Sequence, residues 1–130
     1  MQARATGTFQ VTMTPLPPGD GPAGLGRFRL AKTFEGELAG TSLGEMLSAG
    51  NPASGSAGYV ALEVVDGAIG ERRGTFALQH GGTMDAGTQS LSITVVPGSG
   101  TGGFAGMAGR LLLEIAGGVH NFTLEFQLPD

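Results

Sequence analysis

Eight short segments of alternating apolar and polar residues constrain the fold of this chain more than any other feature. In residues 7–14, Phe9, Val11 and Met13 share one side and Thr or Gln residues share the other, which is the period of a β-strand. The other segments are residues 27–35, 41–49, 56–69, 75–80, 90–96, 111–116 and 119–128. No helical period of useful length interrupts them, so the pattern predicts an all-β protein.

Turn residues separate these segments and favour closure into a barrel. Residues 15–24 are rich in Pro and Gly and are expected to form a loop. Gly makes up 25 of the 130 residues but is scattered among Val, Ile, Leu, Phe and Thr, which excludes collagen and argues against disorder. An antiparallel barrel removes exposed strand edges, and its bends need glycine. We therefore expect residues 1–130 to form one domain, a single antiparallel eight-stranded barrel.

Composition excludes several classes of function. A net charge of −4 with only 14% charged residues leaves no basic surface for nucleic acid. The absence of Cys removes disulfides, thiolate nucleophiles and Cys-bound zinc. No run of about 18 apolar residues is present to cross a bilayer, so we expect no membrane partner and a cytoplasmic location.

Two stretches carry a family resemblance. The sequences GTFALQHGGTM and LSITVVPGSGTGGFAGMAG resemble the allene oxide cyclase and dirigent superfamily of small barrels. Within that superfamily, KTFEGELAGTSLGEML and GSAGYVALE look similar to bacterial proteins of unknown function. The resemblance implies an allene oxide cyclase-like, calycin-like barrel, in which the Gly-Thr-Gly turn at residues 100–102 marks fold rather than chemistry.

The resemblance says less about a reaction. Plant allene oxide cyclases close a ring on an unsaturated fatty epoxide in an apolar barrel, with a glutamate, an ordered water and a cysteine among the cavity residues. This chain has no Cys, and their glutamate aligns with neither Glu45 nor Glu63 in particular. The cyclase activity is therefore not carried over from the resemblance.

Four ionisable residues interrupt the apolar side of their strands: Lys32, Glu45, His80 and His120. If the apolar sides face the interior, these four converge there. A buried Lys32 requires a carboxylate partner, for which Glu45 is the first candidate and Glu63 the second. A structural ion pair and satisfied core histidines are the alternative to a ligand or catalytic site.

Further readings stay open at this point. Tyr59 and Glu63 share one side of residues 56–69 and would hydrogen-bond one ligand together, or else face solvent or a partner subunit. Which side of this segment faces inward is undecided. His80 precedes a Gly pair and His120 follows one, which is also compatible with the barrel rim. The chain lacks the His-x-His of metal-binding barrels, so we expect no metal and no cofactor.

Two classes of function follow. The first is a binding barrel for a small hydrophobic molecule, and the second is a cyclase-like or isomerase-like enzyme with general acid/base residues. The candidate catalytic residues are Glu45, His80 and Tyr59, and the candidate ligand-binding residues are Lys32, Glu63, His120, Phe34, Phe76, Leu78 and Phe122. Phe28, Leu91 and Phe126 are expected in the same cavity wall.

A third reading is an oligomeric module without enzymatic activity. Val60, Leu62 and Val64 would form an exposed apolar stripe if their side of the strand faces outward. Burial of such a stripe against a second copy predicts a homo-oligomer, a dimer or trimer.

Overall fold

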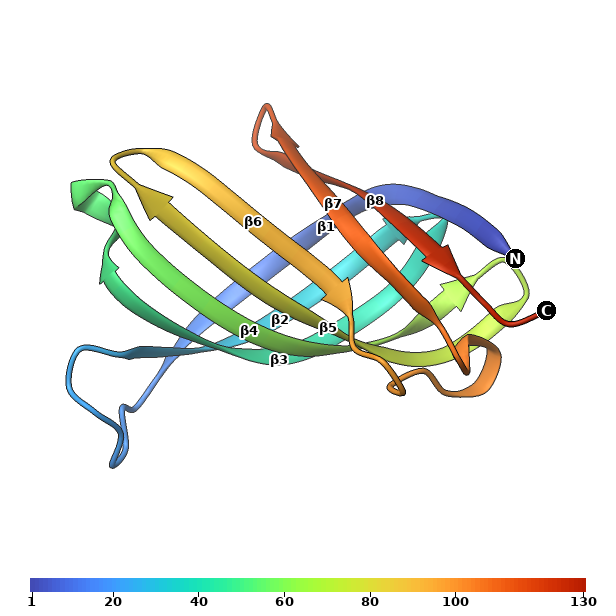
Figure 1. Ribbon diagram of the computed structural model, residues 1–130, viewed down its shortest axis with the longest axis horizontal. Coiled ribbons are helices and arrows are strands. Elements are labelled where there is room, and N and C mark those ends of the chain that lie inside the picture. Colours follow the sequence, from blue (N-terminus) through green and yellow to red (C-terminus); the bar gives the residue numbers. More distant parts are fainter.

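A computed structural model describes residues 1–130 and shows a closed antiparallel barrel in which each strand pairs with its neighbours in sequence and β1 pairs with β8 (Figure 1). The strands are β1 (Gln2–Leu16), β2 (Gly26–Gly36), β3 (Leu38–Asn51), β4 (Ser56–Ile69), β5 (Arg72–Asp85), β6 (Thr88–Val95), β7 (Ala108–Ala116) and β8 (Val119–Gln127). Two single-turn 3₁₀ helices, η1 (Pro52–Ser54) and η2 (Gly102–Phe104), complete the chain. The predicted all-β, eight-stranded antiparallel barrel is confirmed.

The strands are mostly longer than the alternation predicted. β1 starts at Gln2 because Ala3 and Ala5 continue its inward side, although two small residues give little hydrophobic signal. The loop predicted for residues 15–24 is confirmed over residues 17–24, which are exposed, whereas Pro15 and Leu16 end β1. Figure 1 shows this loop, between β1 and β2, extending away from the barrel body.

One half of the barrel interior is a packed apolar core. Most core residues alternate along the strands and share the inward side, as the period of two requires, and three others lie outside the strands. They are Ala5, Phe9, Phe34, Leu38, Val65, Phe76, Leu78, Ile93, Val95, Phe104, Met107, Leu111, Phe122, Leu124, Phe126 and Leu128. This half contains the chain termini and the β2–β3, β4–β5 and β6–β7 connections, and we call it the closed end.

The Gly-rich segment between β6 and β7 plugs the closed end. Phe104 of η2 is fully buried, and its ring meets the edge of the Phe76 ring with 5.3 Å between centroids. Thr101 fastens the segment to β5, because its Oγ1 accepts a hydrogen bond of 3.0 Å from the backbone N–H of Thr75. The conspicuous Gly-Thr-Gly turn is therefore part of the fold, as expected.

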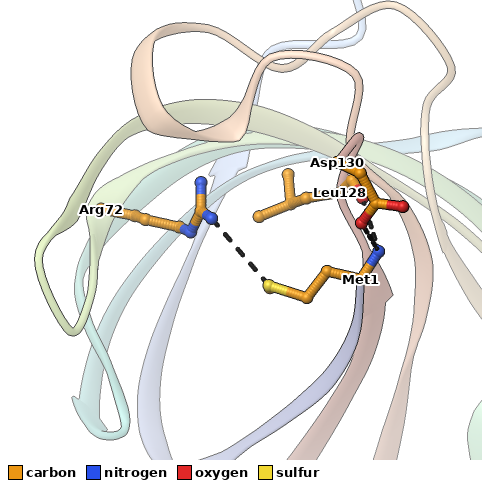
Figure 2. Close-up of polar contacts among 4 residues, drawn as sticks. All are labelled: Met1, Arg72, Leu128 and Asp130. Carbon is orange, nitrogen blue, oxygen red and sulfur yellow. Dashed lines mark hydrogen bonds and ion pairs between the residues drawn. The ribbon is translucent and has the colours of Figure 1, made fainter.

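The two ends of the chain meet at the same end of the barrel (Figure 2). The Met1 ammonium donates to the Leu128 carbonyl at 3.1 Å and lies 2.9 Å from Oδ1 of Asp130. Arg72 reaches the Met1 sulfur at 3.9 Å. The ion pair with Asp130 and the contact with Arg72 are exposed and add only a small gain in stability, whereas the hydrogen bond to Leu128 is partly buried.

The opposite end of the barrel is open. β6 and β7 share a single register pair, Thr94 with Arg110, whereas the other neighbouring strands pair over eight or more positions. Figure 1 shows the β7–β8 hairpin parting from β6 beyond this point. We call this end, which holds the β1–β2, β3–β4, β5–β6 and β7–β8 hairpins, the open end. No helix in the structure is long and apolar enough to cross a membrane.

Candidate functional site

Four polar residues are buried inside the barrel: Lys32, Ser42, Glu63 and His80. They come from β2, β3, β4 and β5, respectively, and each occupies an inward position of its strand. We call them the polar layer. Because charged side chains are seldom fully buried without a reason, this layer is the first place to look for function.

Glu63 is the centre of the polar layer. Its Oε2 lies 2.9 Å from Nζ of Lys32 and 3.5 Å from Nε2 of His80, and its side chain has no exposed surface. Nζ of Lys32 also lies 4.6 Å from the centre of the Phe9 ring, a favourable position for a cation over an aromatic face. The buried lysine thus has a counter-charge on one side and an aromatic face on another.

The polar layer is incompletely hydrogen-bonded. Across the chain, the buried side-chain atoms without a hydrogen-bond partner are Ser42 Oγ, both carboxylate oxygens of Glu63 and Nε2 of His80. The contact between Lys32 and Glu63 is close enough for an ion pair, but its angles do not meet those of a hydrogen bond. Unpaired polar atoms are costly to bury, so their concentration in one layer requires an explanation.

The surroundings of Glu63 keep it ionised. Burial raises the pKa of its carboxyl group, but the contacts with His80 and the charge of Lys32 lower it by more. The pKa of Glu63 is therefore below the ordinary value of 4.5. Tyr59 shifts the other way, because burial and then the nearby charge of Glu63 raise the pKa of its phenol.

This shift predicts a loss of stability in acid. The pKa of the Glu63 carboxyl group is lower in the folded protein than in the unfolded protein, where it is about 4.5. Ionisation of the group therefore stabilises the fold above pH 4.5, and this stabilisation is lost as the pH falls through the pKa of the folded protein. We expect the urea midpoint to fall below about pH 4.5. Chemical denaturation between acid and neutral pH measures it.

Glu37 must be separated from this effect. Hydrogen bonds from Thr6 lower the pKa of this exposed carboxyl group as well. A Glu37→Gln protein should keep most of the acid dependence, whereas a protein with both Lys32→Met and Glu63→Gln should lose most of it. Equal acid dependence in the wild type and the double variant would show that Glu63 is not its source.

Glycines opposite the large inward side chains create the space that the site occupies. Gly44 pairs with Glu63 in the β3–β4 register, and a Cβ atom at Gly44 would lie 2.7 Å from the Glu63 Cα. Gly82 pairs with Tyr59 between β4 and β5, and a Cβ there would lie 2.5 Å from the Tyr59 ring. Both side chains therefore depend on a missing side chain in the next strand.

A pocket of about 350 Å³ lies at the open end of the barrel. We call it the mouth pocket, and it is lined by Met13, Phe28, Met46, Ser48, Pro52, Ala57, Gly58, Tyr59, Gly82, Thr83, Met84, Gln89, Ser90 and Leu91. Three of the chain's five methionines are among these residues. Methionine is flexible and polarisable, so such a wall adapts to apolar ligands of different shapes.

Tyr59 connects the mouth pocket with the polar layer. It lines the pocket, and its ring centroid lies 6.5 Å from that of His80. The ring is partly buried, and its hydroxyl makes no hydrogen bond with another residue of the chain. From the open end inward, the site therefore consists of the methionine-rich mouth pocket, the Tyr59 ring and the buried ion pair of Lys32 and Glu63.

The prediction that Glu45 points inward is wrong. Its side chain is 62% exposed on the outer face of β3 and forms an ion pair with Arg27 at 2.8 Å. Leu43 and Leu47 share that outer face, so the apolar side of this strand faces outward. Glu63, the second candidate, is the carboxylate that pairs with Lys32.

The other predicted site residues divide between the layer, the mouth and the core. Lys32 and His80 are buried inside, and Tyr59 lines the mouth pocket. His120 is half-buried and stacks on Phe9 with 5.0 Å between ring centroids. Phe34, Phe76, Leu78 and Phe122, expected to line a cavity, instead pack in the core of the closed end, whereas Phe28 and Leu91 do line the mouth pocket.

Sequence reasoning missed Ser42 and the three methionines of the mouth pocket. Met13 was placed in a strand, but without a role, because methionine on an apolar side also suits a packed core. Ser42 gave no signal, since it alternates with apolar residues like any exposed serine. No group of three or more His, Asp or Glu side chains is arranged to hold a metal ion.

A family model and a solved structure both match this chain over nearly its whole length, and neither is described as allene oxide cyclase-like. Residues 5–126 match the family model described as "Protein of unknown function (DUF3224)". A crystal structure of a protein with unknown function from the DUF3224 family of Shewanella oneidensis MR-1 is similar over 100% of this chain and 99% of that one, with 43% identity and a TM-score of 0.90. No curated protein matches this chain.

Proposed function

Because the chain belongs to the DUF3224 family of unknown function, we propose its function from the barrel interior: it binds a small hydrophobic molecule in the mouth pocket. The observation that carries the proposal is the contrast between the two halves of the barrel. The closed end is filled by its own side chains, whereas the open end holds a methionine-lined space with Tyr59 at its inner side.

The dimensions and chemistry of the mouth pocket support this proposal. A volume of about 350 Å³ falls in the lower part of the range of small-molecule sites. Such sites combine apolar walls with a few polar groups that orient the ligand, and Tyr59 provides one here.

The test uses N-phenyl-1-naphthylamine, a neutral apolar dye that fluoresces when it leaves water. We expect saturable binding to the wild type and its loss in Ala57→Phe, which fills the mouth pocket. A second hollow, the outer groove, lies over β2, β3, β4 and β5, and its lining residues include Leu43, Leu62 and Ala77 as well as the buried Glu63 and His80. Ala77→Phe makes the same change on the outer face of β5 and should bind the dye like the wild type. Loss of binding in Ala77→Phe alone would move the site to the outer face, and no binding by the wild type would refute the proposal.

A cyclase-like or isomerase-like enzyme of the allene oxide cyclase type is the second candidate function. Glu63, His80 and Tyr59 offer acid and base groups beside an apolar pocket. However, a general base works best when its pKa is near the working pH, and the pKa of Glu63 is lowered instead. This difference favours binding. In an enzyme, Glu63→Gln would abolish turnover while the ligand still bound.

A homo-oligomer, a dimer or trimer, is a separate proposal about the outer surface. Val60, Leu62 and Val64 lie on the outer face of β4 and are each more than half exposed, at 58%, 56% and 54%. Leu43 and Leu47 extend this stripe on β3, and such stripes commonly mark interfaces.

Replacement of Leu62 by Asp tests the oligomer. We expect the wild type to sediment as a dimer or trimer and Leu62→Asp as a folded monomer, because the side chain lies on the outer face of the barrel and is 56% exposed. A wild type that sediments as a monomer at high concentration would refute this proposal. The absence of a cofactor and of nucleic-acid or membrane partners, and the cytoplasmic location, remain predictions from the sequence.

A further inference from the structure

We infer that the ligand of the mouth pocket carries a hydroxyl group, as a hydrophobic alcohol or phenol whose oxygen reaches the polar layer beside Glu63. This inference rests on the proposed function and specifies its ligand class. It follows from the unpaired atoms of the layer, from the balance of charge within it and from its position relative to the pocket.

The unpaired atoms call for a group that both donates and accepts hydrogen bonds. An ionised Glu63 only accepts, and its Oε1 has no partner although the side chain has no exposed surface. Lys32 only donates, and its ammonium has more protons than its one ion pair uses. A hydroxyl beside this ion pair would donate to Oε1 of Glu63 and accept from Lys32 or His80, which leaves fewer buried atoms unpaired.

The charges of the layer discriminate between kinds of polar group. The positive charge of Lys32 and the negative charge of Glu63 balance each other at 2.9 Å. A ligand carboxylate would add a second negative charge next to Glu63, and a ligand ammonium would compete with Lys32. A neutral hydroxyl adds no charge, so it avoids the cost of burying one.

The position of Tyr59 gives the direction of the ligand. Tyr59 lines the mouth pocket, and its ring centroid lies 6.5 Å from that of His80, so the polar layer begins on the far side of this ring from the pocket. Ser48 and Gly82 pair with Tyr59 in the two neighbouring strands and also line the pocket, so the ring is flanked by one small side chain and one glycine. A ligand whose apolar part lies among the methionines would therefore extend its hydroxyl group past the edge of the Tyr59 ring, toward the polar layer.

Competition against N-phenyl-1-naphthylamine tests the inference with three probes that share one ring system: 2-naphthol, naphthalene and 2-naphthoate. We expect 2-naphthol to displace the dye at a concentration about tenfold lower than naphthalene does. A gain in affinity of about this size is expected from one charge-assisted hydrogen bond. 2-Naphthoate should be the weakest. In the double variant Lys32→Met/Glu63→Gln, 2-naphthol and naphthalene should compete about equally, while dye binding shows that the pocket is intact.

Each outcome separates the two proposals. If the dye binds but naphthalene competes as well as 2-naphthol, the hydroxyl inference fails and the binding pocket stands. A preference for 2-naphthoate would also overturn it, because the layer would then attract an anion. If the double variant does not fold, the order in which the three probes displace the dye from the wild type still tests the hydroxyl inference. If the wild type binds no dye, the proposed function itself fails.

Discussion

Replacement of Glu63 by Gln should lower the free energy of unfolding by about 3–5 kcal/mol, since removal of one partner of a buried ion pair leaves the other charge uncompensated. Lys32 is only 8% exposed, and the Glu63 carboxylate is its counter-ion at 2.9 Å. Gln keeps the shape of the side chain, so the loss reports charge rather than packing. Urea denaturation at neutral pH measures it.

Two matched variants make this result specific. Adding Lys32→Met to Glu63→Gln removes the unpaired charge, and should recover much of the lost stability. Glu45→Gln breaks the exposed pair with Arg27 and should cost less than about 1 kcal/mol. Similar losses in Glu63→Gln and Glu45→Gln would contradict the structural assignment of the buried carboxylate.

Replacement of Gly44 by Ala should destabilise the barrel by about 3 kcal/mol, at the upper end of overpacking effects. A Cβ atom at this position would lie 2.3 Å from the Leu62 carbonyl oxygen and 2.6 Å from the Glu63 Cβ. Two of the three nearest atoms are backbone of β4, which cannot rotate away as a side chain does. β3 and β4 would therefore separate beside the polar layer.

Gly81→Ala is the control for this prediction. No atom lies within 4 Å of a Cβ built at Gly81, which has no left-handed backbone. We expect a change of less than about 1 kcal/mol, with any gain arising from lower entropy of the unfolded chain. Thermal denaturation of both variants compares them, and a Gly44→Ala protein as stable as Gly81→Ala would show that β3 tolerates a side chain there.

Much of the fold could be predicted because alternation and turn residues are local signals. Residues 56–69 were predicted as a strand and match β4. The shape of the interior could not be predicted in the same way. Closure at one end depends on Phe104 and Met107, which lie in a Gly-rich segment without any strand pattern, and on their contacts with distant strands.

The site was predicted in part, and the error at Glu45 has a physical cause. The rule that apolar sides face inward fails on β3, where Leu43 and Leu47 face outward and Ser42 and Gly44 face inward. Gly44 is small because Glu63 of the next strand occupies the space above it. The pairing of Gly44 with Glu63 can be seen only when the register of β3 and β4 is known. The pattern of β3 alone therefore predicts Glu45, rather than Glu63, as the inward carboxylate.

The mouth pocket was harder still to predict. Phe34 and Phe122 looked like a cavity wall, but their rings pack against each other at 5.6 Å in the closed end. The pocket forms instead where the barrel parts, and its methionines come from strands that are distant in sequence. Periodicity identifies which residues share one side of a strand, but not which half of the interior is filled.

The most direct test of the binding site is NMR of methionine methyl groups labelled with ¹³C, recorded during addition of N-phenyl-1-naphthylamine. Met13, Met46 and Met84 line the mouth pocket, whereas Met107 is buried at the closed end and Met1 lies beside Asp130. We predict that the first three signals shift and saturate together, while those of Met1 and Met107 stay in place. Binding of the dye with the three mouth signals unmoved would contradict the account.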